Sequence, residues 1–222
     1  MTVYASMEQT MYLEVFNRLA ASQGSDYGLQ DTPDAILWIK ADPTRKSDLS
    51  TIVPMVRRDL KQLGLTSTDL IGRCFRVAIG VSRRLCSAGV RHTFTVGDVL
   101  VDGTAFYKAT PDSLRREYEN GFVEGQPINA HAWITLECGT VLDMTILPSV
   151  AYHRHGRKLK LIQSIYTSNA PSPYKITHVP MILGPMFAVR TCVGTFPESL
   201  DVASRWITDI DEMMSDGGVG AA

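Results

Sequence analysis

The sequence predicts a protein of the α+β class, in which helices come first along the chain and antiparallel strands follow. Two observations support this. Apolar residues in the first ninety positions recur mainly with helical spacing, whereas later segments alternate apolar and polar residues with the period of two that is typical of strands. The 222 residues are 45% hydrophobic and 20% charged, which is enough apolar material for one domain with its own core.

Caps and turns set the bounds of the expected elements. Gly64 and Gly89 are placed to end helices, Asp102-Gly103 marks a turn, and Pro111 opens a short helix. The expected helices cover 6–21, 48–63, 73–88, a short segment from 111 and 197–214. The expected apolar segments and strands cover 36–39, 91–96, 99–101, 131–136, 140–146, 174–179 and 187–193.

These elements predict a single domain over residues 1–215. Its first part, about 1–65, is helical. The last residues, 216–222, are of low complexity and are expected to form a disordered tail.

The segment HAWITLECGTVLDMTI, residues 131–146, has the pattern of a β-hairpin. Apolar residues occupy alternate positions on each arm, so that each arm has one apolar face. A three-residue loop ending at Gly139, a residue that adopts the left-handed conformation such loops require, pairs Leu136 with Thr140. This register places both apolar faces on the same side of the sheet, whereas a two-residue turn would place them on opposite sides.

The same register brings His131 and Asp143 together on the other face of the hairpin. As diagonal neighbours on adjacent strands they are roughly 7–8 Å apart at the backbone, which is within side-chain reach. An imidazole beside a carboxylate is the pairing that orients a catalytic base, and a chance ion pair on a polar face is the alternative. Because this face is expected to point away from the core, replacing Asp143 by Ala should leave stability nearly unchanged.

A catalytic His–Asp pair needs a nucleophile, and the four cysteines are the candidates because no Gly-x-Ser-x-Gly motif is present. Cys74 is the best placed, near the start of a helix, where unpaired N–H groups and the helix dipole favour an anion. Cys86 lies near the end of the same helix, Cys138 at the hairpin tip and Cys192 in a late strand. The alternative role for Cys74 is that of a small buried apolar residue, since its helical face is otherwise apolar.

Two blocks of the sequence resemble the transglutaminase-like superfamily of cysteine enzymes. GRCFRVAIGVSRRLCSAGVRHTFTVG, residues 72–97, resembles the nucleophile segment, in which Gly-x-Cys and an aromatic residue open a helix that is followed by a strand. HAWITLECGTVLDMT, residues 131–145, resembles the second block, with His-Ala-Trp on one strand and Asp-x-Thr on the next. Together the blocks cover under a fifth of the chain.

The resemblance implies a papain-like arrangement, in which a helix that carries the thiol packs on an antiparallel sheet that carries the histidine and the carboxylate. It implies that Cys74 is the nucleophile, that His131 takes its proton and that Asp143 orients the imidazole. The residue that would stabilise the oxyanion has no clear match; Gln62 and Thr68 are candidates beside the backbone N–H of Cys74.

The segment 102–129, between the two blocks, is longer than the resemblance requires. It either covers the cleft and shapes its specificity or is an insertion without a role.

The function expected from this arrangement is acyl transfer through a thioester at Cys74. The substrate would be a peptide, a protein or a small amide or ester, and hydrolysis by a peptidase or amidase is preferred because water is always present. No cofactor and no metal are expected. The alternative is a non-catalytic binding module that uses the same cleft for a protein partner.

Composition and charge exclude other classes. The net charge of −1 argues against a nucleic-acid binder, and no apolar stretch reaches the length of about 20 residues that a membrane span needs. The dispersed cysteines and the absence of a secretory signal predict a cytoplasmic protein, while the sequence carries no indication of oligomeric state. The basic stretch at 152–160 is expected to be a solvated loop, and the His-x-His spacing of His153 and His155 does not by itself make a zinc site.

Overall fold

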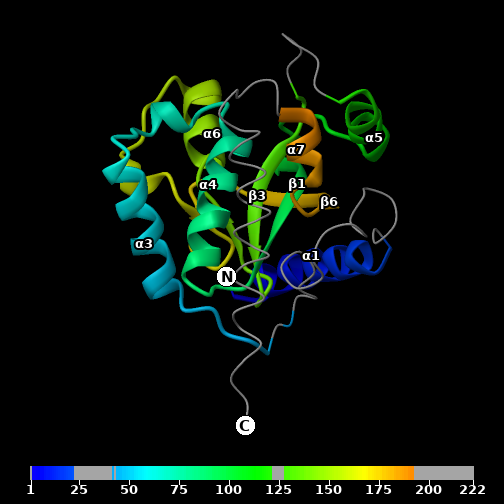
Figure 1. Ribbon diagram of the computed structural model, residues 1–222. Coiled ribbons are helices and arrows are strands. Elements are labelled where there is room, and N and C mark those ends of the chain that lie inside the picture. Colours follow the sequence, from blue (N-terminus) through cyan, green and yellow to red (C-terminus); the bar gives the residue numbers. More distant parts are fainter. Residues whose placement is uncertain (1, 23–41, 43, 122–127, 193–222) are drawn as a thin grey trace.

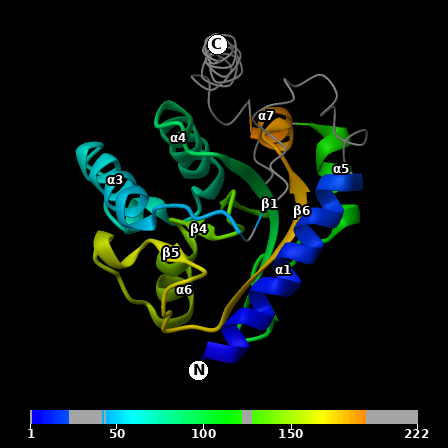
Figure 2. The ribbon, with the colours of Figure 1, turned by 90° about the horizontal axis from the view of Figure 1, so that it is seen from below.

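The computed structural model describes residues 2–22, 42, 44–121 and 128–192, and within them the α+β class is confirmed. Six α-helices in these residues surround an antiparallel sheet of six strands (Figure 1). Figure 2 shows α3 and α4 side by side at one edge of the view, and α1 running beside β6. The helices are α1 (Thr2–Ser22), α3 (Leu49–Gln62), α4 (Cys74–Ser87), α5 (Pro111–Asn120), α6 (Ile146–His155) and α7 (Met186–Cys192), with 3₁₀ turns η2 (Thr68–Leu70) and η3 (Leu161–Gln163).

The sheet has the order β6-β1-β3-β4-β5, and every pair is antiparallel. The short β2 pairs with the last residues of β1. The strands are β1 (His92–Val101), β2 (Thr104–Ala105), β3 (His131–Leu136), β4 (Val141–Asp143), β5 (Tyr166–Thr167) and β6 (Ile176–Leu183). Strands far apart in the sequence therefore become neighbours, with β6 next to β1.

The register predicted for the hairpin is present. The N–H of Leu136 donates to the carbonyl of Thr140 at 2.9 Å, and Gly139 adopts a positive φ of 79°. Strand β4, however, ends at Asp143 instead of continuing to residue 146. The Asp143 carboxylate accepts the N–H groups of Thr145 and Ile146, which begin α6, so the second arm turns into a helix.

The predicted strands at 91–96 and 99–101 are one strand, β1, with a bulge between Val96 and Gly97. Glycine inside a strand pattern often marks a bulge rather than a strand end. A Cβ at Gly97 would lie 2.0 Å from the carbonyl oxygen of Val179 on β6, so only glycine fits at this position.

Two other expectations about the second half of the chain were wrong. The segment predicted as a strand at 187–193 forms α7, where Phe187 and Thr191 are buried one helical turn apart. The stretch 152–160, expected to be a solvated loop, is largely exposed, but its first residues, including His153 and His155, form the last turn of α6, which ends at the left-handed Gly156. The expected segments at 36–39, 197–214 and 216–222 lie outside the described residues.

Both faces of the sheet are buried, each by different helices. Helices α3, α4 and α7 pack over the face that carries Ile134, Leu136 and Leu142, together with Leu114 of α5. Helices α1 and α6 cover the opposite face, where the indole N–H of Trp133 donates to the hydroxyl of Tyr12 at 3.0 Å. The expectation that the His131 face points away from the core is therefore wrong, because a second apolar core lies over it.

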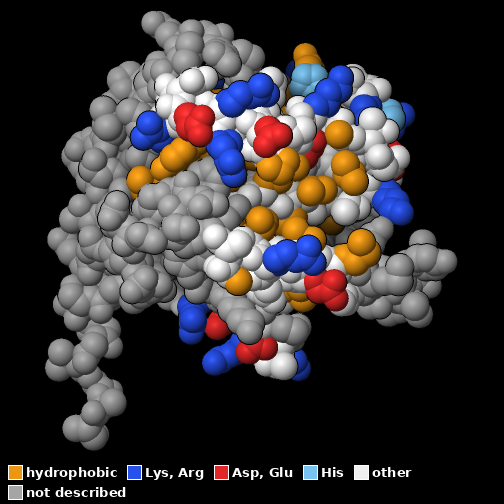
Figure 3. Space-filling model, turned by 90° about the vertical axis from the view of Figure 1, so that its right-hand side faces the viewer, with side chains coloured by type: hydrophobic (Ala, Val, Ile, Leu, Met, Phe, Trp, Pro, Cys, Tyr) orange, Lys and Arg blue, Asp and Glu red, His pale blue; other side chains and the backbone are white. Residues whose placement is uncertain are grey.

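One side of the described surface carries charges of both signs. Figure 3 shows Lys, Arg, Asp and Glu side chains interspersed with apolar ones on one side of the molecule, as the net charge of −1 suggests. In the described part of the chain, no helix combines the length and the apolar character required to cross a membrane.

Candidate active site

The start of α4 and the start of β3 meet at the predicted nucleophile. Cys74 is the first residue of α4, and its thiol lies 3.8 Å from the carbonyl oxygen of Ala130, the residue that precedes His131. The Cys74 side chain is only 7% exposed. The structure therefore brings the thiol to the end of the strand that carries the predicted base, in a largely buried position.

His131 and Asp143 form the hydrogen bond that the hairpin register predicts. The Nε2–H of His131 donates to Oδ2 of Asp143 at 2.6 Å, and both side chains are fully buried. The other carboxylate oxygen, Oδ1, accepts the N–H groups of Thr145 at 2.9 Å and Ile146 at 3.1 Å. The carboxylate is thus held by the first turn of α6 on one side and by the imidazole on the other.

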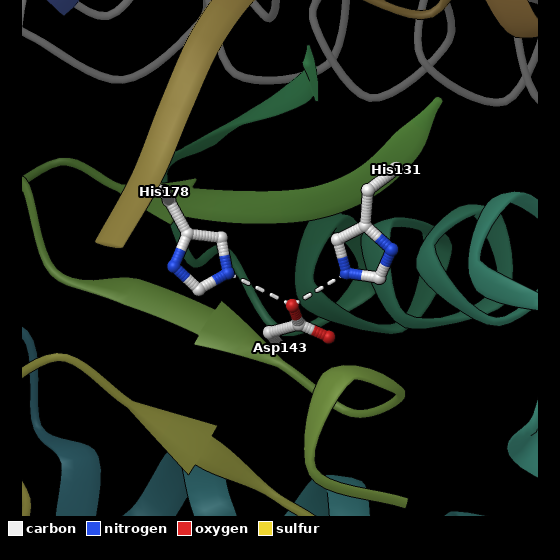
Figure 4. Close-up of side chains that lie close together, drawn as sticks. All are labelled: His131, Asp143 and His178. Atoms are coloured by element: carbon white, nitrogen blue, oxygen red, sulfur yellow. Dashed lines mark hydrogen bonds and ion pairs between the residues drawn. The ribbon is translucent and has the colours of Figure 1, made fainter. Parts of the chain in front are cut away.

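A second histidine, His178 of β6, shares the same carboxylate oxygen (Figure 4). Its Nε2 lies 2.9 Å from Oδ2 of Asp143, and since an ionised carboxylate can only accept, His178 donates this bond. The sequence offered no partner for His178, because β1 lies between β6 and the His131 strand. Burial alternates along β6 and places His178 on the inner face, but the residue types of 176–183 do not alternate and so gave no sign of this.

Burial and charge act in opposite directions on these three groups. Burial disfavours the charged form of His131, but the charges of Asp143 and of an ionised Cys74, together with the hydrogen bond to Asp143, outweigh it and raise the pKa of His131 to about 10. Burial likewise disfavours the Asp143 carboxylate, yet His131 and His178 hold its pKa well below its usual range. Burial and the charge of His131 lower the pKa of His178, so that at neutral pH His131 is charged and His178 is neutral.

The second ring nitrogen of His131 is the open position of the site. Nδ1 is buried and has no hydrogen-bond partner among the described residues. Because Nε2 donates to Asp143, we infer that Cys74 interacts with the imidazole through Nδ1. The arrangement can therefore hold a thiolate and an imidazolium side by side, with the carboxylate behind the imidazolium.

The same cluster offers a donor set for a metal ion. The ligand atoms of His131, Asp143 and His178 all lie within 4.8 Å of one another, and two imidazoles with one carboxylate suit zinc or ferrous iron. Both imidazoles, however, donate a proton to Asp143, and a metal would have to displace both protons. The geometry is that of a hydrogen-bonded array.

The other residues considered from the sequence are placed differently. Burial raises the pKa of the Cys86 thiol to about 11. Burial also acts against the Cys138 thiolate, but hydrogen bonds from Ser47 and Thr140 outweigh it and lower the pKa of that thiol. The side chains of the oxyanion candidates, residues 62 and 68, are exposed, unlike Cys74. The side chain of residue 192 lies outside those described.

Comparison of the chain with protein-family models, with curated proteins and with solved structures finds no match in any of the three.

Proposed function

We propose that the protein is a cysteine-dependent acyl-transfer enzyme with Cys74 as nucleophile, His131 as acid and base, and Asp143 as the orienting carboxylate. One observation carries this proposal. A buried imidazole is fixed at Nε2 by a carboxylate and has no hydrogen-bond partner at its other nitrogen, and the thiol at the start of α4 interacts with the same ring. A nucleophile, a base and an orienting group are the three parts that such chemistry requires.

The reaction follows from these parts. The Cys74 thiolate attacks the carbonyl carbon of an amide or ester, and the oxyanion that forms lies near the N–H groups of the first turn of α4, which lack intrahelical partners. As the bond to the leaving group breaks, the Nδ1–H of His131 protonates the departing amine or alkoxide and a thioester remains. Water or an amine then gives a proton to Nδ1 and attacks the thioester, which releases the acyl product and restores the thiolate.

The resemblance to the transglutaminase-like superfamily supports the same assignment. The nucleophile helix precedes the sheet in the chain, α4 packs on β3, and the His and Asp lie on adjacent antiparallel strands. These features agree with the papain-like arrangement that the two blocks imply, and they support the proposal. Hydrolysis remains the preferred outcome, because any acceptor other than water would need a binding site of its own.

The near-complete burial of Cys74 favours a second candidate, a binding module that keeps the same fold without catalysis. Such a module has no use for a reactive thiol, so thiol reactivity separates the two functions.

The test is competitive alkylation of the intact protein at about pH 6 with limiting iodoacetamide, followed by peptide mass mapping of all four cysteines. We expect Cys74 to be labelled first, ahead of Cys138, which is its strongest competitor, and well ahead of Cys86. His131→Ala should abolish the preference for Cys74 because the thiolate loses its imidazolium. His92→Ala, which removes another buried histidine, is the matched control and should leave the preference intact.

Equal labelling of Cys74 in the wild type and in His131→Ala contradicts the proposed enzyme and favours the binding module. A second measurement uses p-nitrophenyl acetate as a generic acyl donor. An acetyl adduct on the Cys74 peptide, lost in Cys74→Ser, is expected from an acyl-transfer enzyme.

A further inference from the structure

Tyr107 lies in the segment 102–129, to which the sequence assigned no definite role, and it covers His131. Its ring is stacked on the imidazole, with centroids 4.7 Å apart and planes inclined by 17°. The Tyr107 side chain is half-buried, whereas His131 beneath it is not exposed at all. The backbone N–H of Tyr107 donates to the buried carboxylate of Asp98 at 3.0 Å, which fixes this part of the chain over the site.

The hydroxyl of Tyr107 has a polar neighbour, the side chain of Ser149 on α6, which interacts with it. The single hydroxyl proton of Ser149 is donated to the carbonyl of Thr145 at 2.7 Å. A hydrogen bond between Tyr107 and Ser149 would therefore have to be donated by Tyr107, since Ser149 has no second proton to give.

These contacts surround the base. Tyr107 lies against Ser149, which donates to Thr145, and the N–H and hydroxyl of Thr145 donate to Asp143 at 2.9 and 3.2 Å. Asp143 in turn holds His131, on which Tyr107 stacks. The bond at Nε2 fixes one end of the imidazole, and the stacked ring fixes its plane, so that Nδ1 stays directed toward Cys74.

We propose that Tyr107 is a positioning residue, which holds the imidazole plane of His131 through its ring and is itself held by Ser149. This proposal rests on the proposed function, because it assigns Tyr107 a role in presenting His131 to Cys74. Burial, together with the charges of Cys74 and Asp143, raises the pKa of Tyr107 well above its ordinary value, so the hydroxyl keeps its proton over the working range. The segment 102–129 thus contributes to the site and is more than an insertion.

The experiment measures the rate of Cys74 alkylation by iodoacetamide as a function of pH, with thermal unfolding recorded for each variant. The variants are Tyr107→Leu, which removes the aromatic ring, Tyr107→Phe, which removes only the hydroxyl, and Ser149→Ala, which removes the polar neighbour of that hydroxyl. Tyr152→Phe is the matched control. Tyr152 lies on α6, as Ser149 does, but its side chain is 44% exposed.

We expect Tyr107→Leu to slow the alkylation roughly tenfold to a hundredfold at acid pH, and to move the pH profile toward that of an unassisted thiol. Tyr107→Phe and Ser149→Ala should each slow it about fivefold, the effect of one hydrogen bond. The double variant should be no slower than either single one, because both remove the same interaction. Tyr152→Phe should match the wild type.

Three results would overturn the role of Tyr107. The first is a Tyr107→Leu profile that is unchanged, and the second is one that is faster by the same factor at every pH, which would make the ring a mere cover. The third is additivity of Tyr107→Phe and Ser149→Ala. If Tyr107→Leu does not fold, the near-isosteric Phe variant and the Ser149 variant decide the matter.

The same data separate this proposal from the proposed function. If His131→Ala leaves the wild-type profile unchanged, the cysteine–histidine pair itself is wrong. If His131→Ala changes the profile and the Tyr107 variants do not, only the positioning role is wrong.

Discussion

Two buried histidines, His92 and His131, stand near opposite ends of the same β1–β3 ladder and have opposite properties. His92 pairs with Leu136 in the ladder, and His131 pairs with Gly97. Both are almost entirely enclosed, and each has a cysteine nearby. Their partners at the ring nitrogens make the difference.

His92 has the environment of a structural histidine. Its Nδ1–H donates to the carbonyl of Val90 at 2.7 Å, so Nε2 accepts from the hydroxyl of Ser82 at 2.7 Å. No carboxylate in the described part of the chain bonds to it. Burial therefore prevails and lowers the pKa of His92 to about 4, which leaves a neutral ring with both nitrogens engaged.

His131 differs in having a carboxylate on one nitrogen and no hydrogen-bond partner on the other. The carboxylate reverses the effect of burial on the pKa, and the open nitrogen is available to the thiol. The comparison teaches that burial alone makes a histidine inert, whereas burial with a buried countercharge and one unsatisfied nitrogen prepares it for proton transfer.

The largest effect is expected from removing that countercharge. Asp143→Ala leaves a buried imidazolium and two N–H groups of α6 without their acceptor, and should lower the free energy of unfolding by about 3–5 kcal/mol. This replaces the sequence-based expectation of nearly unchanged stability, which took the Asp143 face to lie away from the core. Urea denaturation gives the stability, and alkylation of the folded fraction gives the reactivity of Cys74, which should fall as in His131→Ala.

Leu142→Ala is the control for this variant. Leu142 is fully buried on the opposite face, so its truncation should cost about 2–5 kcal/mol through the cavity it leaves. Its Cys74 labelling should stay preferential. If Leu142→Ala lowers the labelling as much as Asp143→Ala, reactivity follows stability, and the contrast between the two histidines loses its support.

A smaller loss of stability is expected from Gly97→Ala, which disturbs the bulge at which β1 pairs with β6, the strand of His178. The added Cβ would meet the Val179 carbonyl oxygen at 2.0 Å and the Trp133 ring at 3.0 Å, at a cost of about 1–3 kcal/mol. Histidine NMR signals should show that His178 leaves Asp143 while His92 is unaffected. Gly80→Ala, where nothing lies within 4 Å of the new Cβ, should be neutral or stabilising by up to about 1 kcal/mol.

The pH dependence of stability sharpens the contrast further. The pKa of His131 is raised in the folded state, so its contribution is complete below about pH 6.5 and is lost as the pH rises toward 10. The pKa of His92 is lowered, so stability is lost as the pH falls from about 6.5 toward 4. The two histidines together predict that the free energy of unfolding has its maximum near pH 6.5. On the acid and alkaline limbs of this curve it should fall by at most about 1.4 kcal/mol per pH unit for each proton.

Chemical denaturation across this range tests the assignment of each limb. His131→Gln should flatten the alkaline limb and leave His92's part of the acid limb in place. His92→Gln should weaken only the acid limb, to which Asp143 and His178 also contribute. If His131→Gln changed the acid limb and His92→Gln the alkaline limb, the pKa directions given for the two histidines would be wrong.

The smallest effect is expected from Ser82→Ala. It removes the donor to Nε2 of His92 and should cost about 1 kcal/mol in a urea titration. Cys74 labelling should not change, and Cys86 should stay slow because its partial burial keeps the pKa of its thiol raised. A change in Cys74 reactivity would mean that the two ends of the ladder are coupled.

The sequence by itself determined the local parts of this protein. Period-two alternation and Gly139 set the hairpin register, and that register alone places His131 beside Asp143. The start of α4 at Cys74 was also readable, because caps and helical spacing act within a few residues of each other. Such features depend on contacts between positions close in the chain, which a pattern can report.

Only the tertiary structure decided what surrounds the pair. His178 and Tyr107 reach the site from 35 residues after Asp143 and from the segment before β3, and nothing in their own neighbourhood predicts this. The second core over the His131 face and the helix at Met186–Cys192 could not be predicted from the sequence for a related reason. The sequence shows that an apolar residue will be buried but not which residues will cover it. Its packing partners depend on which distant segments come together as long loops close, and on how much volume remains between whole helices and strands.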